Sequence, residues 1–431
     1  MKPILLTADS KGKIFDIPAL TATGAKSGVI QPLKSSDLIK LPYGSELFVL
    51  PDRLAVGYDE SNEQFISTNQ LNLSEGSKKT GFAVAAFISP GYTLTKSTSF
   101  IQAKPNLTPL PLFSYAPVAL YKNIFYVPAI RVDSERRQDL RLMPKEKIQQ
   151  NVIEFEKIFK KNRLFHQLKK CALIYNCPAG KNFFLNRYEG PLPTSQTCNA
   201  RCLGCISLQQ NSCCPATQPR IEFTPTPDEI AEIALFHIKK TKNPVVSFGQ
   251  GCEGEPLMVW KTICKAIEII RKSTVKGTIN LNTNASKPDI ISKLIDTGLN
   301  SIRVSLNSAR KDKYHLYYRP LTYNFNDVTS SIRTAKKLGT FVSINYLTMP
   351  GFTDNTKEVS ALLKLIERTN IDMIQWRNLN YDPIEYCKVM QSEQDPKKMI
   401  GIKNLMELIK MRFPNIKFGY FNPPKEKWGL A

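Results

Sequence analysis

The sequence predicts an α/β fold in its second half, preceded by a mainly-β region. From about residue 190, apolar and β-branched segments alternate with amphipathic segments, which is the pattern of repeated βα units. Right-handed crossovers between such units give a doubly wound sheet or a full or partial (β/α) barrel. Before residue 144, short apolar runs lie between Pro, Gly, Ser and Asn residues, and no helical period is strong.

The mainly-β region is expected to form a smaller N-terminal domain over residues 1–143, and no recognisable site motif indicates its role. Its strands are expected at 46–50, 81–88, 117–121 and 123–130. A single helix is then predicted over 144–170, because Pro144 suits a first turn and Ile148, Val152 and Phe155 share one face. Residues 144–188 are interpreted as a helical linker.

The α/β region is predicted over residues 189–385, with a C-terminal helix and tail over 386–431. Apolar strands buried on both faces are expected at 245–249, 278–282, 301–307, 341–347 and 373–379. Helices are expected at 226–240, 256–273, 287–297, 326–338, 354–369 and 397–412. The first of these helices has Thr226 as a cap and Pro227 in its first turn.

Composition places the chain among globular proteins of a reducing compartment. It has 431 residues, 42% of them hydrophobic and 22% charged, and no apolar run approaches the 18 residues of a membrane span. The start has only a four-residue apolar run, too short for a signal peptide, and all ten cysteines follow residue 170. We therefore expect a cytoplasmic protein whose cysteines serve a metal or catalysis. The net charge of +22 favours phosphate-rich or acidic partners.

The stretch TCNARCLGC, residues 197–205, places three thiols at i, i+4 and i+7: Cys198, Cys202 and Cys205. Three thiolates can hold three irons of a [4Fe–4S] cluster, which leaves the fourth iron to a ligand that is not a cysteine. Structural zinc is the alternative, and it would need a fourth ligand from a distant residue. The spacing alone favours the cluster and leaves zinc open.

A glycine-rich turn, FGQGCEGEP at 248–256, ends one predicted strand and precedes a helix. Gly249, Gly251 and Gly254 allow the backbone to approach a ligand closely. Glu255 adds a carboxylate where the strand ends, and such an edge can hold an ammonium group. A tight βα turn with a capping glutamate is the alternative interpretation.

The cysteine motif CNARCLGC together with GCEGEP at 251–256 resembles the radical S-adenosylmethionine (radical SAM) superfamily. The resemblance covers about residues 190–385 and implies a partial (β/α)6 barrel of the TIM type. It implies that Cys198, Cys202 and Cys205 ligate a [4Fe–4S] cluster and that S-adenosyl-L-methionine binds the fourth iron. The family's Gly-Gly-Glu motif, which binds the methionyl amine, corresponds here to Glu253, Gly254 and Glu255, with Glu253 departing from glycine.

Later strand ends extend the resemblance to further cofactor-binding residues. Asn282 and Asn284 share one face of TINLNTNAS, where the family has polar residues facing the site. Arg303, Ser305 and Asn307 share one face of the strand that supplies ribose and carboxylate contacts. A salt-bridged barrel interior would also explain these three residues.

Two positions leave the site incompletely defined. Gly204 stands where the family usually has an aromatic residue near the adenine, so adenine packing is expected from Leu203, Ile206 or Tyr346. QWRNLN at 375–380 places Gln375 and Arg377 on one face and Asn378 and Asn380 on the other. Either pair can contact a substrate, and the sequence does not say which face points inward.

The remaining cysteines and the histidines carry weaker signals. Cys171, Cys177, Cys213 and Cys214 have irregular spacing, so buried or free thiols are favoured over a second metal site. Cys252 is interpreted as a small residue in a tight turn rather than a radical or methyl relay. Cys264 and Cys387 look structural. The three histidines, His166, His237 and His315, show no metal spacing.

The resemblance implies reductive cleavage of S-adenosylmethionine to methionine and a 5′-deoxyadenosyl radical, which abstracts hydrogen from a substrate. A peptide or protein substrate is favoured by the preceding β region, and an RNA-modifying enzyme is the alternative. The basic charge also suits a flavodoxin or ferredoxin as electron donor. A non-catalytic, metal-stapled binding protein is the hypothesis from another class.

Overall fold

The computed structural model describes residues 1–70, 81–209 and 215–429, and Cys213 and Cys214 lie outside these ranges. The first part of the chain is mainly β, as predicted, and forms one antiparallel sheet in the order β11-β7-β5-β2-β1-β12-β13-β4, joined at its sides by β3, β6, β9 and β10. Strand β8 pairs with β14 in a separate ladder. The strands are β1 (Ile4–Ala8), β2 (Ile14–Lys26), β3 (Val29–Pro32), β4 (Ile39–Lys40), β5 (Glu46–Asp59), β6 (Gln64–Ser67), β7 (Phe82–Phe87), β8 (Tyr92–Leu94), β9 (Ser97–Thr98), β10 (Phe100–Gln102), β11 (Ala116–Pro117), β12 (Ala119–Tyr121), β13 (Ile124–Val127) and β14 (Ala129–Arg131).

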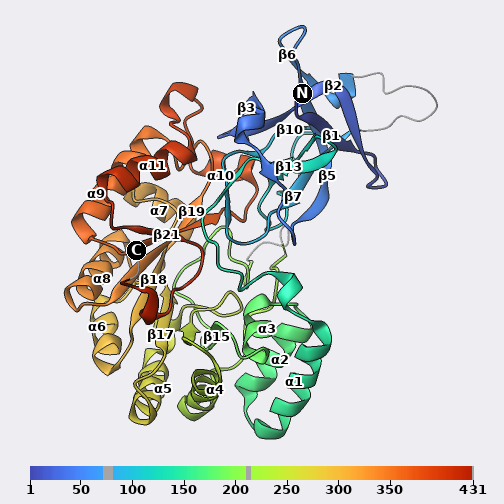
Figure 1. Ribbon diagram of the computed structural model, residues 1–431. Helices are drawn as coiled ribbons and strands as arrows, with labels where there is room; N and C mark the ends of the chain where they lie inside the picture. Colours follow the sequence, from blue (N-terminus) through green and yellow to red (C-terminus); the bar gives the residue numbers. More distant parts are fainter. Residues whose placement is uncertain (71–80, 210–214, 430–431) are drawn as a thin grey trace.

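The second part of the chain contains a parallel sheet whose strands follow chain order, which confirms the α/β prediction. Its strands are β15 (Glu189–Pro191), β16 (Val245–Phe248), β17 (Thr278–Thr283), β18 (Ser301–Leu306), β19 (Phe341–Thr348), β20 (Met373–Asn378) and β21 (Lys417–Gly419). Figure 1 shows this sheet curled, with helices along its outer side and the β region beside its β19–β20 end. The short β15 and β21 were not predicted, because three residues are too few to show a period.

The six helices predicted after residue 190 are present, with some shifted ends, whereas the helices at Lys311–Tyr318 and Pro383–Val389 were not predicted. The predicted single helix over 144–170 is wrong, because Asn162 caps a second helix by accepting a hydrogen bond from the Phe165 amide at 3.0 Å. The helices are α1 (Lys145–Ile158), α2 (Arg163–Leu173), α3 (Pro178–Phe184), α4 (Pro227–Lys240), α5 (Trp260–Ser273), α6 (Pro288–Thr297), α7 (Lys311–Tyr318), α8 (Phe325–Lys337), α9 (Thr356–Thr369), α10 (Pro383–Val389) and α11 (Ile402–Arg412).

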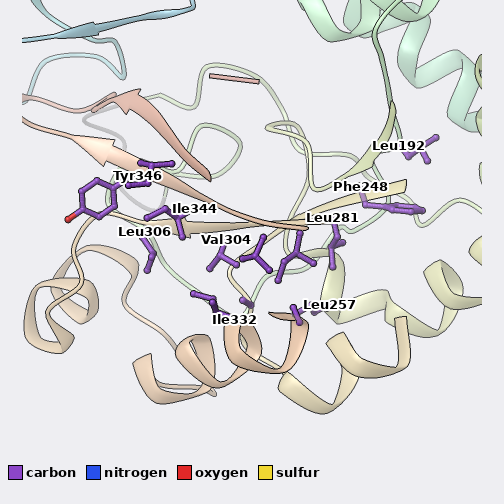
Figure 2. Packing of buried hydrophobic residues seen from close by; sticks show 14 of the residues in the cluster. Leu192, Phe248, Leu257, Leu281, Val304, Leu306, Ile332, Ile344 and Tyr346 are labelled. Atoms are coloured by element: carbon purple, nitrogen blue, oxygen red, sulfur yellow. The ribbon is translucent and has the colours of Figure 1, made fainter. Parts of the chain in front are cut away.

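The two faces of the parallel sheet differ, as the polar residues predicted on one face of the segments at 278–286 and 301–309 indicated. Outward residues such as Leu281, Val304 and Ile344 are fully buried against the helices, as Figure 2 shows. Inward positions of the same strands are polar and include Asn280, Arg303 and Gln375. Because side chains alternate in this way, the apolar core lies between the sheet and the outer helices, and the inner face of the curled sheet is polar.

The β region is joined to the carboxyl end of β20 by hydrogen bonds. The Leu94 amide donates to the Asn378 side chain at 2.9 Å, and that side chain donates to the Tyr92 carbonyl at 3.0 Å. Asp382 accepts a hydrogen bond from the Leu110 amide at 2.9 Å. Asn378 therefore serves the junction with the β region, which leaves Gln375 and Arg377 on the inward face. In the part of the chain that the structure describes, no helix is long and apolar enough to cross a membrane.

Candidate functional site

The cysteine loop, residues 197–205, follows β15 and is bonded to the glycine turn that follows β16. The Gly254 amide donates to the Ser195 carbonyl at 2.7 Å, and the Glu255 amide donates to the Thr197 carbonyl at 2.8 Å. A Cβ atom added at Gly254 would lie 2.0 Å from the Thr197 carbonyl oxygen. Only glycine therefore allows the loop and the turn to approach this closely.

The three thiols of the loop lie near enough to influence one another. Burial, with the neighbouring Cys198 and Cys205 thiols, raises the pKa of Cys202 well above its ordinary value. Burial and the Glu255 carboxylate raise the pKa of Cys198 to about 11. The Arg220 guanidinium lies 3.6 Å from the Cys205 sulfur. Cys198 and Cys202, whose pKa values are raised by burial, would become thiolates on binding a cationic group.

This donor set fits an iron–sulfur cluster. Among the described residues, no three His, Cys, Asp or Glu side chains form a group suited to a single metal ion. Iron–sulfur clusters are held by Cys thiolates, so the three thiols suit such a cluster by residue type.

Glu255 is a buried carboxylate beside the cysteine loop, held by three donors. Its oxygens accept hydrogen bonds from the Thr283 hydroxyl at 2.5 Å, the Asn284 amide at 2.8 Å and the Leu257 amide at 3.1 Å. Burial raises the pKa of Glu255 to about 7, against the lowering effect of these donors. The carboxylate is thus fixed in position and can accept a proton near neutrality.

Glu253 is buried in the same turn but is enclosed by backbone amides. One carboxylate oxygen accepts from Gly249 and Gln250 at 2.7 and 2.6 Å, and the other from Thr194 and Ser195 at 2.7 and 2.9 Å. Burial raises the pKa of Glu253 to about 7, although all four donors favour its charged form. Its side chain therefore ties the turn to the segment between β15 and the cysteine loop.

The predicted polar residues of β17 divide between two neighbourhoods. The Asn284 side chain donates to Asn199 of the cysteine loop at 2.7 Å, so Asn284 lies with Glu255 at the loop. Asn282 donates to the Gly249 carbonyl at 3.0 Å and accepts from Asn422 at 3.2 Å. Asn282 therefore connects the glycine turn with the C-terminal tail.

The predicted residues of β18 also separate. Arg303 donates to Gln375 at 3.3 Å, and burial together with Arg377 lowers its pKa to about 9. Ser305 lies two residues further along the same inward face. Asn307 follows the strand, and its side chain donates to the Lys313 carbonyl and the Tyr386 hydroxyl, both at 3.2 Å. Asn307 thus lies among α7 and α10 rather than beside Arg303.

Gly204 lies against Tyr317 of α7. A Cβ added at Gly204 would lie 2.6 Å from the Tyr317 hydroxyl, so this ring fills the space that a side chain at 204 would take. Leu203 donates its amide to the Tyr317 carbonyl at 3.0 Å, and Ile206 packs on Gly251. Tyr346, in contrast, lies in the apolar layer between the sheet and the helices, as Figure 2 shows.

Sequence reasoning missed Asn199, Arg220, Tyr317 and Asn422. Asn199 lies inside the cysteine motif, so its position was a usable signal. Arg220 and Tyr317 reach the loop from distant segments, and nothing in a single sequence indicates such contacts. Among the other cysteines, Cys171 contacts Cys252, and Cys177 donates its amide to the Cys171 carbonyl at 2.9 Å.

The segment that carries the cysteine loop and the glycine turn is a radical SAM domain, in agreement with the resemblance. Residues 192–363 match the family described as the radical SAM superfamily. An uncharacterised protein of Methanocaldococcus jannaschii is 30% identical over 39% of this chain and 59% of its own length. A probable GTP 3′,8-cyclase of the same organism is 30% identical over 37% of this chain and 54% of its own length.

Two further comparisons give lower sequence identities. A probable dual-specificity RNA methyltransferase of Flavobacterium johnsoniae is 27% identical over 52% of this chain and 66% of its own length. A solved structure of anSMEcpe with bound AdoMet is 17% identical, covers 54% of this chain and 63% of its own chain, and has a TM-score of 0.39. The chain spans about half the length of the first two curated relatives.

Proposed function

We propose that this protein is a radical SAM enzyme that holds a [4Fe–4S] cluster with Cys198, Cys202 and Cys205. The observation that carries the proposal is the contact between the cysteine loop and the Gly254–Glu255 turn, which places a fixed carboxylate beside the thiol trio. When bound, the cluster and S-adenosylmethionine supply a reductive cleavage that yields methionine and a 5′-deoxyadenosyl radical for hydrogen abstraction.

The chain's own residues would bind and orient the cofactor. Glu255, held by Thr283 and the Asn284 amide, accepts the methionyl ammonium group. Glu253 keeps the turn in shape, and its backbone, with that of Gly254, lies beside the cofactor. The further predicted contacts are Asn282, Asn284, Arg303, Ser305 and Asn307. Tyr317 joins Leu203 and Ile206 as a candidate for packing on the adenine, in place of Tyr346.

We further propose that residues 189–385 form the partial (β/α)6 barrel of this family, after an N-terminal domain at 1–143 and a helical linker at 144–188. The last part, 386–431, adds a helix and a tail. The β region, which joins the carboxyl end of β20 through Asn378 and Asp382, suits the docking of a peptide or protein substrate. A flavodoxin or ferredoxin would donate electrons to this basic, cytoplasmic protein.

RNA modification is the second candidate, favoured by the net charge of +22 and by the relative named as an RNA methyltransferase. Incubation of the reduced enzyme with labelled S-adenosylmethionine and either cellular RNA or a peptide library would distinguish them. Label or mass change confined to RNA would replace the peptide proposal. A non-catalytic metal protein would show neither.

The activity is tested by anaerobic reconstitution, reduction and measurement of 5′-deoxyadenosine. Wild-type protein should form it, and Glu255→Gln should bind S-adenosylmethionine about tenfold more weakly at unchanged iron content, because the neutral amide no longer pairs with the ammonium group. Cys264→Ala, on the outer helix α5, is the matched control and should behave as wild type. Stoichiometric zinc in a colourless protein would refute the proposal.

A further inference from the structure

The amino ends of β15 and β16 border a pocket that the proposed reaction does not use. Its volume is about 390 Å³, and its lining includes Asn186, Arg187, Tyr188, Lys242, Asn243 and Lys427. We call it the basal pocket. These residues precede the two strands, whereas the cysteine loop and the glycine turn follow them. The basal pocket therefore opens at the opposite end of the sheet from the thiol trio.

The backbone around the basal pocket is held in an unusual conformation. Asn186, Tyr188 and Asn243 have φ values of 50°, 55° and 47°, in the left-handed region. Asparagine tolerates this region, but a tyrosine there is a true outlier. The Tyr188 carbonyl accepts the Val245 amide at 3.1 Å and the His237 ring nitrogen at 3.3 Å, which keeps the strained residue in place. Strain of this kind concentrates at binding sites.

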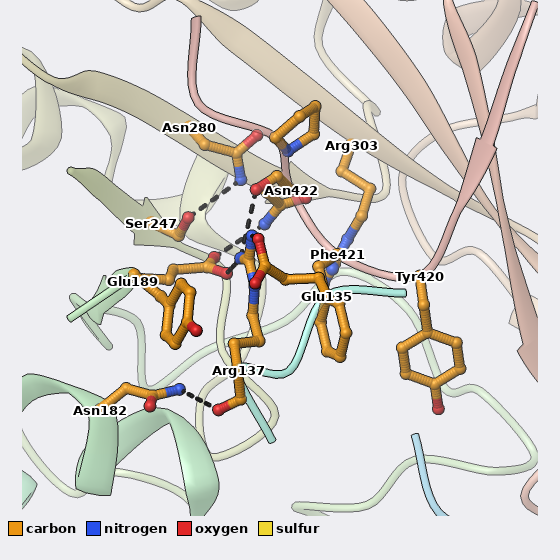
Figure 3. A network of polar contacts seen from close by, with 12 residues as sticks. Glu135, Arg137, Asn182, Glu189, Ser247, Asn280, Arg303, Tyr420, Phe421 and Asn422 are labelled. Atoms are coloured by element: carbon orange, nitrogen blue, oxygen red, sulfur yellow. Dashed lines mark hydrogen bonds and ion pairs between the residues drawn. The ribbon is translucent and has the colours of Figure 1, made fainter. Parts of the chain in front are cut away.

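Two buried polar atoms of the lining lack a hydrogen-bond partner in the described structure. One is Nη2 of Arg187, a donor, and the other is Oδ1 of Asn186, an acceptor. The Arg187 Nε atom is oriented by Asn182, whose side chain accepts its hydrogen bond at 2.7 Å. Asn182 in turn donates to the Arg137 carbonyl at 2.9 Å, as Figure 3 shows. A ligand would have to offer both an acceptor and a donor to satisfy these atoms.

The charge of the basal pocket is positive. Arg187 and Lys242 make no ion pair among the described residues, and Lys427 shares the carboxylate of Glu135 with Arg137 at 3.3 and 4.0 Å. The Arg187 guanidinium also lies 5.3 Å from the centre of the Tyr188 ring, which limits its freedom to turn. Arg187 and Lys242 both line the basal pocket, and a guanidinium and an ammonium are donors that recognise phosphate oxygens.

We propose that the basal pocket binds a small phosphorylated molecule, with its phosphate on Arg187 and Lys242 and a hydroxyl or amino group donating to Asn186. A dianionic phosphate matches two unpaired cations better than a single carboxylate does, and the volume suits a molecule of sugar-phosphate size. The proposal does not rest on the radical reaction, because none of these residues belongs to the cysteine site.

Isothermal titration calorimetry of the reconstituted full chain tests the proposal with ribose 5-phosphate, ribose, inorganic phosphate and citrate. Ribose 5-phosphate should bind at least about tenfold more tightly than ribose and more tightly than inorganic phosphate or citrate. Arg187→Gln and Lys242→Gln should each weaken it about tenfold. Arg187→Lys, which keeps the charge but not the fork, should weaken it less.

Arg333→Gln, on an exposed part of α8, is the matched control and should bind as wild type. Thermal melting of each variant verifies the fold. Absence of binding by ribose 5-phosphate, tighter binding of citrate, or an equal loss in Arg333→Gln would overturn the proposal. Because the readout is binding heat, failure here would leave the radical SAM proposal untouched.

Discussion

The inside of the curled sheet has two polar regions that use their buried groups differently. The cysteine loop gathers three thiols, and burial and neighbouring groups raise the pKa values of two of them, Cys198 and Cys202. The other region surrounds Asn422 of the C-terminal tail, where the side chain donates to Glu189 at 2.8 Å and accepts from Gln375 at 3.0 Å. Figure 3 shows this second network, in which Arg137 pairs with Glu189 at 3.1 Å.

This difference suggests that the cysteine loop is a candidate binding site and that the Asn422 region is a structural network. At Asn422 the chain supplies donors and acceptors to its own charged groups, although the Nε atoms of Arg137 and Arg303 have no hydrogen-bond partner among the described residues. At the thiol trio the chain supplies three thiols and a nearby carboxylate. A group bound to these thiols would offset the free-energy cost of burying them. Variants in the first region should therefore change stability, and variants in the second should change ligand content.

The largest effect is expected for Cys202→Ser. Cys202 is one of three predicted cluster ligands, and a hydroxyl is a poor replacement for a thiolate, so reconstituted iron and sulfide should fall to background. The free energy of unfolding of the metal-free chain should change little. Iron content equal to wild type would contradict the contrast between the two regions, because it would mean that the cysteine trio does not hold the iron.

Glu253→Ala should cause the largest loss of stability. Its carboxylate serves four backbone amides, and its removal leaves them buried without acceptors. We expect the free energy of unfolding to fall by about 3 to 5 kcal/mol, measured by denaturant titration. Glu253→Gln keeps one acceptor oxygen and should lose less. Normal stability in Glu253→Ala would mean that the turn does not depend on this carboxylate.

His237 makes stability depend on pH. Burial lowers its pKa from 6.5 to about 4, so the unfolded chain takes up a proton below pH 6.5 that the folded chain rejects. The contribution of His237 to the free energy of unfolding should decrease by about 3 kcal/mol as the pH falls from 6.5 to 4, whereas the raised pKa values of Glu253 and Glu255 act in the opposite direction. His237→Leu should remove this component, whereas His166→Gln, at an exposed position, should retain it. Identical pH profiles for wild type and His237→Leu would contradict the assignment.

Asn422→Ala should have the smallest effect of the four. It removes a side chain that bonds to Glu189, Asn282 and Gln375, and the free energy of unfolding should fall by about 2 kcal/mol. Cluster content should stay at the wild-type level in the same preparation. Loss of iron in this variant would show that the tail network and the thiol site are one unit.

The sequence predicted the local features of this molecule better than its long-range contacts. The apolar strands and Thr226-capped α4 follow from patterns within a few residues, whereas the spacing at 197–205 favoured a cluster and left zinc open. The helix break at Asn162 was missed because the apolar period continues across it. Neither the approach of Tyr317 to Gly204 nor the inward course of residues 420–424 could be predicted, because each depends on segments far apart in the chain.

The position of Asn422 inside the sheet also constrains the order of folding. Residues 420–424 are synthesised after every strand that they contact. Until they leave the ribosome, Arg137, Glu189 and Gln375 therefore lack the hydrogen bonds that this segment supplies. The nascent sheet can pack its outer helices early, since that layer is apolar and local. Its interior becomes complete only when this late segment has left the ribosome.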